Sequence, residues 1–534
     1  MADDEEIFED AAEQAVFLDE YFGESDSDQD GFDGFDIEDI NLNAEGAIVR
    51  EIAMDQSTRD REFPEDFAWS REDSPPVCAP FTGNPGIKFD TQGMEPIDFF
   101  HKFIPNEFVE LMVTQTNLYA QRKIEENQEN MKPHSRISKW YDVTALELKV
   151  FLALFITMGI VKKSQLDEYW STSEIGETPL FGKHMSKDRF HAILSNLHIV
   201  NNKDAIPVGQ VGHDPLFKVR PLIDLLDTKF TEMYNADENL SFDEATCPFK
   251  GRVKFRVYNP AKPNKFGIKL YQVCEAESGY TVRFDVYHGE TNCIIYCEEL
   301  DLDPDISTKI VIGLLCKCGA LDKGHNIYLD NYYNSPELAE DLNLLNTYMC
   351  GTLRKNRKGV PKAIQSVKLK AGDTIYRRKG NTLVVQFPDK RDVHMISTIH
   401  AATDTVLNKT DKHGIPIIKP TCVVDYCAKM GGVDLSDQVI QYYDILRKTV
   451  KWWRKLFFHL VNVAITNAFI WYKKDQNGTD RNVHVKFRKS IVSALLEEGA
   501  DAPKPKSRGG KTCTTATDRT PLFIIQRRER GSKA

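Results

Sequence analysis

The chain has 534 residues, 41% of them hydrophobic, and its 68 Lys and Arg are outnumbered by 80 Asp and Glu. This length and apolar content predict two to four packed domains. The longest near-continuous apolar stretch, residues 150–161, is too short to cross a bilayer, and the acidic start is unlike a secretory signal. We therefore expect neither an integral membrane protein nor an exported one. Eleven scattered cysteines favour reduced thiols inside the cell.

The acidic charge is concentrated at the start of the chain. Residues 1–49 hold 18 Asp and Glu and no Lys or Arg, so the remaining 485 residues carry a net charge of +6. A segment so acidic and so poor in apolar residues cannot bury enough surface to fold alone. We expect residues 1–90 to form an acidic disordered region. Two roles stay open for it: a solvating tail, or an arm that mimics DNA or contacts host nuclear proteins.

The next segment, residues 95–237, has a helical pattern. Leu146, Val150, Leu154, Met158 and Val161 recur at spacings of three and four, which is typical of a helix face that packs inward. The pattern predicts an all-helical module.

The period of the pattern changes after residue 239. A strand ends at Asp243, and residues 267–274 and 281–288 form two further strands joined by a turn around Gly279. A helix is predicted over 308–320, then a short strand that ends at Asp330, then a helix capped by Ser335. Strand, strand, strand, helix, strand, helix, strand is the order of an RNase H-like core, a mixed sheet flanked by helices. The fold class is therefore α/β plus α.

Asp243 and Asp330 would lie side by side in such a core, because the strands that they end are neighbours. Two adjacent carboxylates repel each other and are commonly stabilised by a divalent cation. Oxygen ligands favour Mg²⁺ or Mn²⁺, and a pair of such ions supports phosphoryl transfer. Asp434, in residues 431–437, is a candidate third acid. The alternatives are turn residues at the ends of strands for the first two and an ordinary helix cap for Asp434.

Basic residues cluster in three blocks. Residues 250–270 hold seven Lys and Arg and no acid, residues 351–391 hold twelve against two acids, and residues 441–534 hold twenty against eight. Aromatic residues lie among them, and cations beside aromatic rings favour nucleic acid over a merely solvated surface. The candidate DNA-binding residues are Lys250, Arg252, Lys254, Arg256, Lys262, Lys265, Arg354, Lys355, Arg447, Lys448, Lys451 and Trp452.

The chain resembles the piggyBac-type transposases in a series of short motifs between residues 95 and 475. The motifs stand in the family's order and spacing: Met158–Lys163, Asp167–Ser171, Met185–Phe190, Leu197–His198, Asp243–Glu244, Phe249–Arg252, Lys262–Lys269, Leu329–Tyr333, Gly351–Arg354 and Gly431–Asp434.

The resemblance implies a DNA strand-transfer enzyme with three catalytic and metal-binding aspartates, Asp243, Asp330 and Asp434, and with Asp437 as a supporting metal-site acid. It also implies two Mg²⁺ or Mn²⁺ ions, double-stranded DNA as substrate, a homodimer and a nuclear location. In the family, water cuts each transposon end, the freed 3′-OH forms a hairpin, and the reopened end joins TTAA target DNA. Trp452 matches a tryptophan that faces the hairpin; a core aromatic is its alternative.

The resemblance also implies a division of the chain. The helical dimerisation and DNA-binding domain is expected in two parts, 95–237 and 441–490. The catalytic core is expected over 238–350 and again over 421–440, with an insertion domain at 351–420 between them. Residues 491–534 are expected to be a basic disordered tail, in which Lys504, Lys506, Arg508 and Lys511 are candidates for a nuclear import signal.

The sequence departs from the family pattern after residue 480. The family generally ends in a Cys- and His-rich zinc module, whereas only Cys513 and His484 follow that point, too few to hold zinc. No zinc site is predicted, and six cysteines are interpreted as core thiols: Cys293, Cys297, Cys316, Cys318, Cys422 and Cys427. Two alternative functions therefore stay open: a domesticated nuclear DNA- or chromatin-binding protein that does not transpose, and a metal-dependent nuclease without joining activity.

Overall fold

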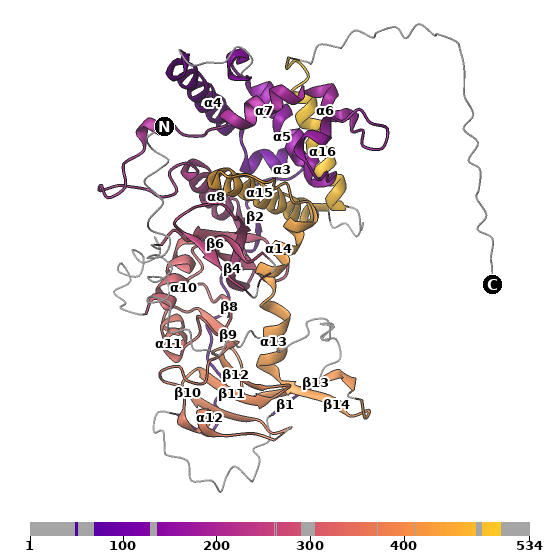
Figure 1. Ribbon diagram of the computed structural model, residues 1–534. Coiled ribbons are helices and arrows are strands. Elements are labelled where there is room, and N and C mark those ends of the chain that lie inside the picture. Colours follow the sequence, from indigo (N-terminus) through magenta and orange to yellow (C-terminus); the bar gives the residue numbers. More distant parts are fainter. Residues whose placement is uncertain are drawn as a thin grey trace, which may run out of the picture.

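The computed structural model describes residues 48–51, 69–128, 136–260, 262, 264–289, 305–370, 372–410, 412–476 and 483–503. These residues form an elongated molecule, with helices at one end and strands through the middle to the other end (Figure 1). One long helix, α15 (Trp452–Gln476), crosses the molecule between the two parts.

The helical end is built mainly from the first half of the chain. Its elements are α3 (Pro96–Phe103), α4 (Asn106–Glu126), η3 (Arg136–Lys139), α5 (Ala145–Ile160), η4 (Leu166–Trp170), α6 (Pro179–His184), α7 (Lys187–Asn196), η5 (Asn202–Asp204), α8 (Arg220–Glu232) and α16 (Val483–Glu498). The predicted helical module is therefore present. The predicted inward face of α5 is right for Val150, Leu154 and Met158 but wrong for Leu146 and Val161, which are 37% and 36% exposed. Those two residues lie at the ends of the helix, where neighbours no longer cover it.

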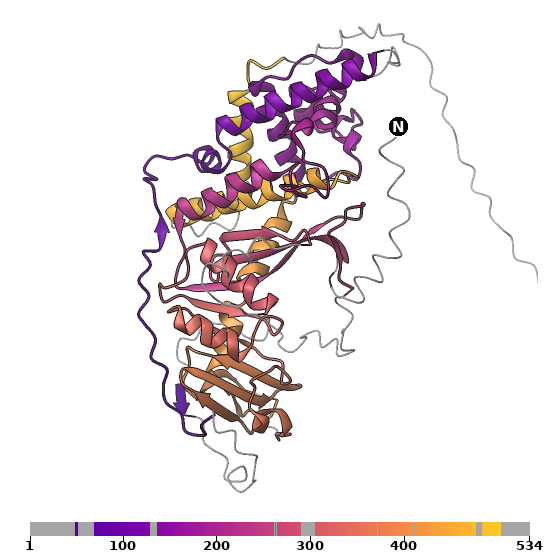
Figure 2. The same ribbon diagram turned by 90° about the vertical axis from the view of Figure 1, so that its left-hand side faces the viewer.

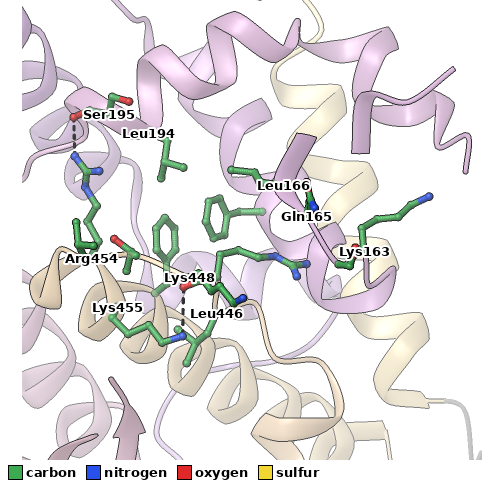
Figure 3. A pocket seen from close by; sticks show the side chains of 15 residues that line it. Lys163, Gln165, Leu166, Leu194, Ser195, Leu446, Lys448, Arg454 and Lys455 are labelled. Atoms are coloured by element: carbon green, nitrogen blue, oxygen red, sulfur yellow. Dashed lines mark hydrogen bonds between the residues drawn. The ribbon is translucent and has the colours of Figure 1, made fainter. Parts of the chain in front are cut away.

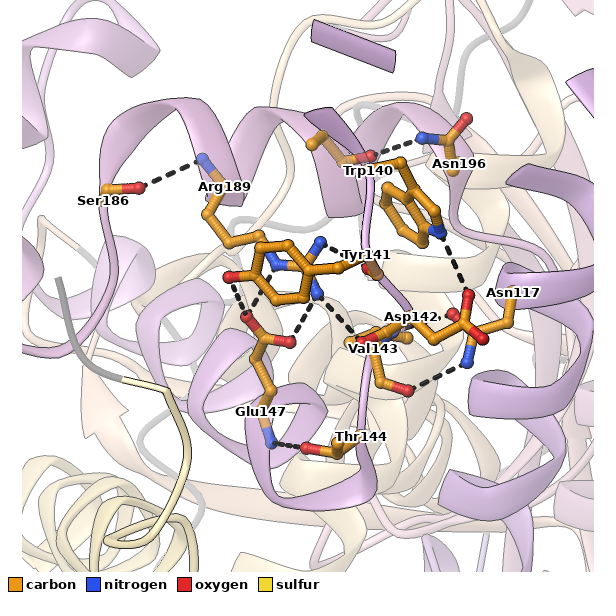
Figure 4. A network of polar contacts seen from close by, with 11 residues as sticks. Asn117, Trp140, Tyr141, Asp142, Val143, Thr144, Glu147, Ser186, Arg189 and Asn196 are labelled. Carbon is orange, nitrogen blue, oxygen red and sulfur yellow. Dashed lines mark hydrogen bonds and ion pairs between the residues drawn. The ribbon is translucent and has the colours of Figure 1, made fainter. Parts of the chain in front are cut away.

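A buried ion pair joins α5 to α7 (Figure 4). The Arg189 guanidinium donates to both carboxylate oxygens of Glu147, at 2.7 and 2.6 Å, and also to the carbonyls of Tyr141 and Asp142. The Tyr141 ring centroid lies 3.6 Å from the guanidinium carbon. Each helix begins with a hydroxyl cap, Thr144 for α5 and Ser186 for α7. These contacts fix the angle at which the two helices cross.

The sheet follows the predicted order of strands and helices. Its elements are β4 (Asn239–Pro248), β5 (Arg256–Tyr258), β6 (Phe266–Glu275), β7 (Thr281–Val286), α10 (Ile306–Lys317), β8 (Asn326–Leu329), α11 (Pro336–Leu344) and β9 (Tyr348–Thr352). The hairpin of β6 and β7 is confirmed, and Ser335 caps α11 as predicted. Two details differ. The strand β5 was not predicted, and β4 continues five residues past Asp243 because its second half pairs with β6 as far as Pro248.

The segment after β9 extends the same sheet. Strands β10 (Ile375–Lys379), β11 (Thr382–Pro388) and β12 (Asp392–Ser397) follow, and β12 pairs with β9. The order is β10-β11-β12-β9-β8-β4-β6-β5, with β7 also on β6. Strands β1 (Ile48–Glu51), β13 (Thr403–Thr410) and β14 (Pro416–Pro420) form a second sheet, and α12 (Lys362–Ser366) and α13 (Thr421–Lys429) pack nearby.

Residues 69–95 form an extended strap along one side of the molecule (Figure 2). Ser70 pairs with Arg378, whose guanidinium also donates to Asp73 at 2.6 Å, and β2 (Gly86–Ile87) pairs with β3 (Tyr234–Asn235). The expectation of disorder over residues 1–90 is therefore wrong at residues 48–51, which form β1, and from residue 69 onward. Partners far along the chain supply the order that local composition lacks.

The expectation of a disordered tail from residue 491 is also wrong for its first part. Residues 483–498 form α16, which packs on α3 and α5 with Phe487, Ile491 and Leu495 buried. The apolar residues of this helix stand between basic ones in the sequence, so composition alone does not indicate a helix here. The candidate import signal at residues 504–511 lies outside the described residues.

Two further findings concern membranes and thiols. None of the described helices is long and apolar enough to span a membrane. The eight cysteines within the described ranges are free thiols. Of those interpreted as core thiols, Cys422 is buried, whereas Cys316, Cys318 and Cys427 are partly buried. Cys293, Cys297 and Cys513 lie outside those ranges.

Candidate active site and nucleic-acid interface

Two of the three predicted acids lie on neighbouring strands. Strands β4 and β8 run parallel, and Phe242 pairs with Leu329 in their register. Asp243 is the next residue of β4, and Asp330 directly follows the end of β8, so the register brings them side by side. Asp243 accepts a hydrogen bond from the Glu244 amide at 2.7 Å, and Asp330 accepts one from the Tyr332 amide at 2.8 Å.

The third acid is carried to the same face of the sheet by α14 (Gly432–Tyr442). The Val433 amide donates to the Ser241 hydroxyl at 3.0 Å, so the start of α14 rests on β4. Side chains alternate along a strand, and Asp243 therefore lies on the face that Ser241 shares with α14. Asp434 lies in the first turn of the helix and is exposed. Its N-cap is Gly431, so Asp434 is not the helix cap.

Gly432 sets how closely α14 approaches the sheet. A Cβ atom on Gly432 would lie 2.5 Å from the Ser241 hydroxyl oxygen and 2.9 Å from the Glu275 carbonyl oxygen, whereas one on Gly431 would meet nothing within 4 Å. We expect Gly432→Ala to lower the free energy of unfolding by about 1–3 kcal/mol, because α14 must move away from β4. Gly431→Ala, the matched control, meets no clash but places Ala at the N-cap, so it should cost less, at most about 0.5–1 kcal/mol. Urea unfolding of both variants tests this, and equal effects would contradict it.

Burial and neighbouring carboxylates raise the pKa values of three acids at this site, Asp243, Asp330 and Asp437. Burial, and then the charge of Asp330, raises the pKa of Asp243 well above its usual value, and Asp434 contributes to the same rise. Burial also raises the pKa of Asp330. One helical turn from Asp434, burial raises the pKa of Asp437 to about 6. Charges that disfavour one another in this way favour binding of a proton or a cation.

The raised pKa of Asp437 predicts a pH-dependent stability. The pKa of Asp437 is about 6 in the folded chain, against an ordinary 3.8. The contribution of Asp437 to the free energy of unfolding is therefore full below pH 3.8 and is lost as pH rises through 6. Asp437→Asn removes that loss. Without divalent ions, we expect the variant to be more stable than the parent by up to about 3 kcal/mol above pH 7, and by little near pH 4.

Thermal unfolding at several pH values in a chelating buffer measures this difference. Asp322→Asn is the control, because Asp322 lies in an exposed turn where it accepts a hydrogen bond from Asn346. A difference between Asp437→Asn and the parent that does not change with pH would contradict the prediction.

The donor chemistry of these acids fits a hard divalent cation. Asp243, Asp330 and Asp434 offer carboxylate oxygens, and none of them forms an ion pair with any residue that the structure describes. A cation would bind these acids at an open site, because no three His, Cys, Asp or Glu side chains among the described residues form a ready-made metal cluster. Asp243 and Asp330 are brought together as predicted, and Asp434 lies on their face of the sheet at greater exposure.

Basic residues border the acids. Lys262 donates to the Glu244 carbonyl at 2.9 Å, and its charge lowers the pKa of Asp437 against the effect of burial. Arg354 donates to Asn331, the residue after Asp330. The other predicted cations of this part, Lys250, Arg252, Lys254, Lys265 and Lys355, are exposed. Arg256 differs, because it donates to the carbonyls of Lys250 and Gly251 and stacks on Phe266, which is a structural role.

The predicted cations at the start of α15 border a cavity of about 720 Å³ (Figure 3). Lys448 lines it, together with Lys163, Arg454 and Lys455, which were not on the predicted list. Arg447 also lines it but donates to the Met158 carbonyl and the Tyr169 hydroxyl, so it ties α5 to this segment as well.

Lys451 and Trp452 lie in the sequence between two groups of residues, 446–450 and 454–455, that line this cavity. Trp452 is half-buried, with its ring 5.2 Å from that of Phe255 in an edge-to-face contact, and Lys451 is exposed. The next residue, Trp453, is buried on the other side of the helix. Trp452 is thus partly exposed, unlike a fully buried core aromatic.

Comparison with known proteins extends this description. A family model described as "Transposase IS4" matches residues 95–469. The human PiggyBac transposable element-derived protein 3 is 25% identical over 453 residues, which cover 81% of this chain and 70% of that protein. The human PiggyBac transposable element-derived protein 5 is 26% identical over 442 residues, 80% of each chain.

Among solved structures, one titled as a piggyBac transposase synaptic complex with hairpin DNA matches with a TM-score of 0.63 and 23% identity. The match covers 79% of this chain and 85% of the other. It shows that the two chains share a fold in which a mixed α/β sheet is combined with helices.

Proposed function

This chain belongs to the Transposase IS4 family, in its piggyBac-type branch, and from that premise we propose that it cuts and joins DNA strands in a metal-dependent reaction. The observation that carries the proposal is the parallel register of β4 and β8, which aligns Asp243 with Asp330. The hydrogen bond from the start of α14 to Ser241 supports Asp434 as the third catalytic residue. Members of this family are DDE-type transposases, which generally use divalent metal ions.

We propose that the sheet from β4 to β9 with α10, α11 and α14 is an RNase H-like catalytic core. In this division residues 351–420 are the insertion domain and residues 421–440 return the chain to the core. Residues 95–237 and 441–490, with α16 added, form the dimerisation and DNA-binding domain. Strand β12 pairs with β9, so strands β10–β12 of the insertion belong to the same sheet as the core.

The proposed chemistry assigns each group a task. Asp243, Asp330 and Asp434 would hold two divalent ions, with Asp437 beside them; bound Mg²⁺ or Mn²⁺ would supply activation of the attacking oxygen and stabilisation of the leaving one. Lys262 and Arg354 border the acids and would draw the phosphodiester toward them. Asp437, whose pKa is raised to about 6, can exchange a proton near neutral pH. Trp452 would stack on a base at the DNA end.

The experiment uses the purified full chain, a DNA duplex that carries an end flanked by TTAA, and Mg²⁺ or Mn²⁺. Hairpin and joined products on a denaturing gel would support the proposal. Nicks alone would replace it with the nuclease alternative. A DNA complex without any product would replace it with a domesticated DNA-binding protein, a function that fits the relatives named as transposable element-derived proteins. A DNA substrate makes the nucleus the proposed compartment.

A further inference from the structure

A second, smaller cavity lies beside the first, on the side of α15 that carries Trp453. Its volume is about 230 Å³, and Ser195 and Arg454 form the wall that it shares with the larger cavity. Helix α4, the residues after α7, the approach to α8 and the start of α15 each contribute to its lining. Segments far apart in the sequence therefore converge on it.

The lining is cationic and contains no acid. Its charged members are Lys123, Lys218, Lys451 and Arg454, and its other members are aromatic, amide, imidazole or hydroxyl side chains. We call it the four-cation pocket. Among the residues that the structure describes, no carboxylate forms an ion pair with any of these four cations. Four like charges around one cavity repel each other, and only an anion could relieve that repulsion from within.

The electrostatics of the pocket agree with its geometry. Burial, and then the charges of Arg454 and Lys451, lowers the pKa of Lys123, and burial followed by the same two charges lowers the pKa of Lys218. Burial lowers the pKa of His198 to about 4, with Arg454, Lys218 and Lys451 contributing. Burial is the largest cause of each shift, and the neighbouring cations act in the same direction.

The walls of the pocket are held in place before any ligand arrives. The Tyr119 ring stacks on His198 at 3.7 Å, and His198 packs against Trp453 at 5.1 Å. Arg454 donates from one terminal nitrogen to the Ser195 carbonyl at 2.6 Å, while its Nε is buried without a hydrogen-bond partner. A buried donor left without an acceptor is costly, and it is one that a ligand oxygen could satisfy.

We propose that the four-cation pocket is a phosphate-binding site that holds one phosphodiester of DNA bound along the start of α15. This inference rests on the proposed function, because it needs DNA to reach α15. DNA is favoured over a soluble phosphate because Lys451 leads from the pocket to Trp452, and Arg454 leads to the larger basic cavity. The two cavities share Ser195 and Arg454, and Lys451 of the pocket directly precedes Trp452 in the chain.

The test compares a Lys123→Gln and Lys218→Gln double variant with a control double variant, Lys183→Gln and Lys489→Gln. The control removes the same charge from exposed positions of the helical end that line neither cavity. DNA affinity is measured against salt in a chelating buffer, where no strand is cut. We expect the slope of log K against log salt to fall by up to about 0.9 in the pocket variant, since neutralisation of one phosphate contributes about that much. The control should keep the parent slope.

A second measurement separates the two sources of phosphate. If the parent is stabilised against heat by inorganic pyrophosphate, at fixed ionic strength, and the pocket variant is not, the pocket binds phosphate. If that effect appears but the DNA slope is unchanged, the assignment to DNA is overturned in favour of a soluble phosphate. If neither changes, the pocket is not a phosphate site.

Folding of the variant is checked at the same time. Without ligand at low salt, the pocket variant should be at least as stable as the parent, because its removed charges repelled Lys451 and Arg454. A Lys123→Arg and Lys218→Arg variant should keep the DNA slope, and loss of the slope in that variant would overturn the proposal. Binding without cleavage would leave this inference intact and count only against the catalytic proposal.

Discussion

Asp330→Asn is expected to lower the rate of DNA strand cleavage by at least about 10²–10³-fold, the effect of removing one group that stabilises transition-state charge. The substitution keeps the size of the side chain and can still accept the hydrogen bond from the Tyr332 amide. It removes one of two adjacent negative charges, so that metal ions are held less well. DNA binding should stay equal or become tighter, because a charge that repels phosphate is lost. Single-turnover cleavage and a binding titration with the same duplex measure the two effects.

Two comparisons make this result specific to the acid pair. Asp243→Asn should give a loss of similar size, because its carboxylate is the register neighbour of Asp330. Asp322→Asn, in the turn before β8, should leave the rate within about two-fold, since its exposed side chain bonds only to Asn346 among the contacts found. Cleavage by Asp330→Asn at the parent rate would refute the assigned acids, whatever the binding titration showed.

The strand and helix order around the acids could be predicted because local signals agree there. Alternation in the strands, the Ser335 cap and the turn at Gly279 all point to the same topology. The neighbouring positions of Asp243 and Asp330 then follow from the order of elements. What the sequence could not indicate is that β4 continues beyond Asp243, because the far half of β4 is stabilised by pairing with β6. The extension of a strand by such pairing depends on tertiary contacts and not on local sequence.

The features that were missed depend on contacts between distant segments. The strap at residues 69–95 has the composition of a disordered region, and its order comes from Arg378 and β3. Lys123 and Lys218 are isolated in the sequence and become part of a cationic pocket only when α4 and α8 meet α15. Glu147 and Arg189 stand 42 residues apart, and Arg189 lies within the motif Met185–Phe190 without any local sign of its partner.

That partnership supports the second large prediction, that Arg189→Met will destabilise the helical end by about 3–5 kcal/mol. The Arg189 and Glu147 side chains are 8% and 2% exposed, so the substitution leaves a buried carboxylate without its counter-ion (Figure 4). It also leaves the carbonyls of Tyr141 and Asp142 without the donors that Arg189 provides. We expect the melting temperature of the helical end, followed by circular dichroism, to fall by roughly 10 °C.

The decisive comparison for this prediction is a second substitution in the same background. Glu147→Leu combined with Arg189→Met removes the stranded charge, and it should recover more than half of the lost stability, because an uncompensated buried charge costs more than a missing ion pair. Recovery should stay incomplete, since the Tyr141 and Asp142 carbonyls still lack donors. Lys187→Met is the surface control: its ion pair with Asp167 is 43% and 56% exposed and should contribute about 0–1 kcal/mol. If the double variant were no more stable than Arg189→Met alone, the loss would come from the packing of the arginine side chain against Tyr141 and not from charge.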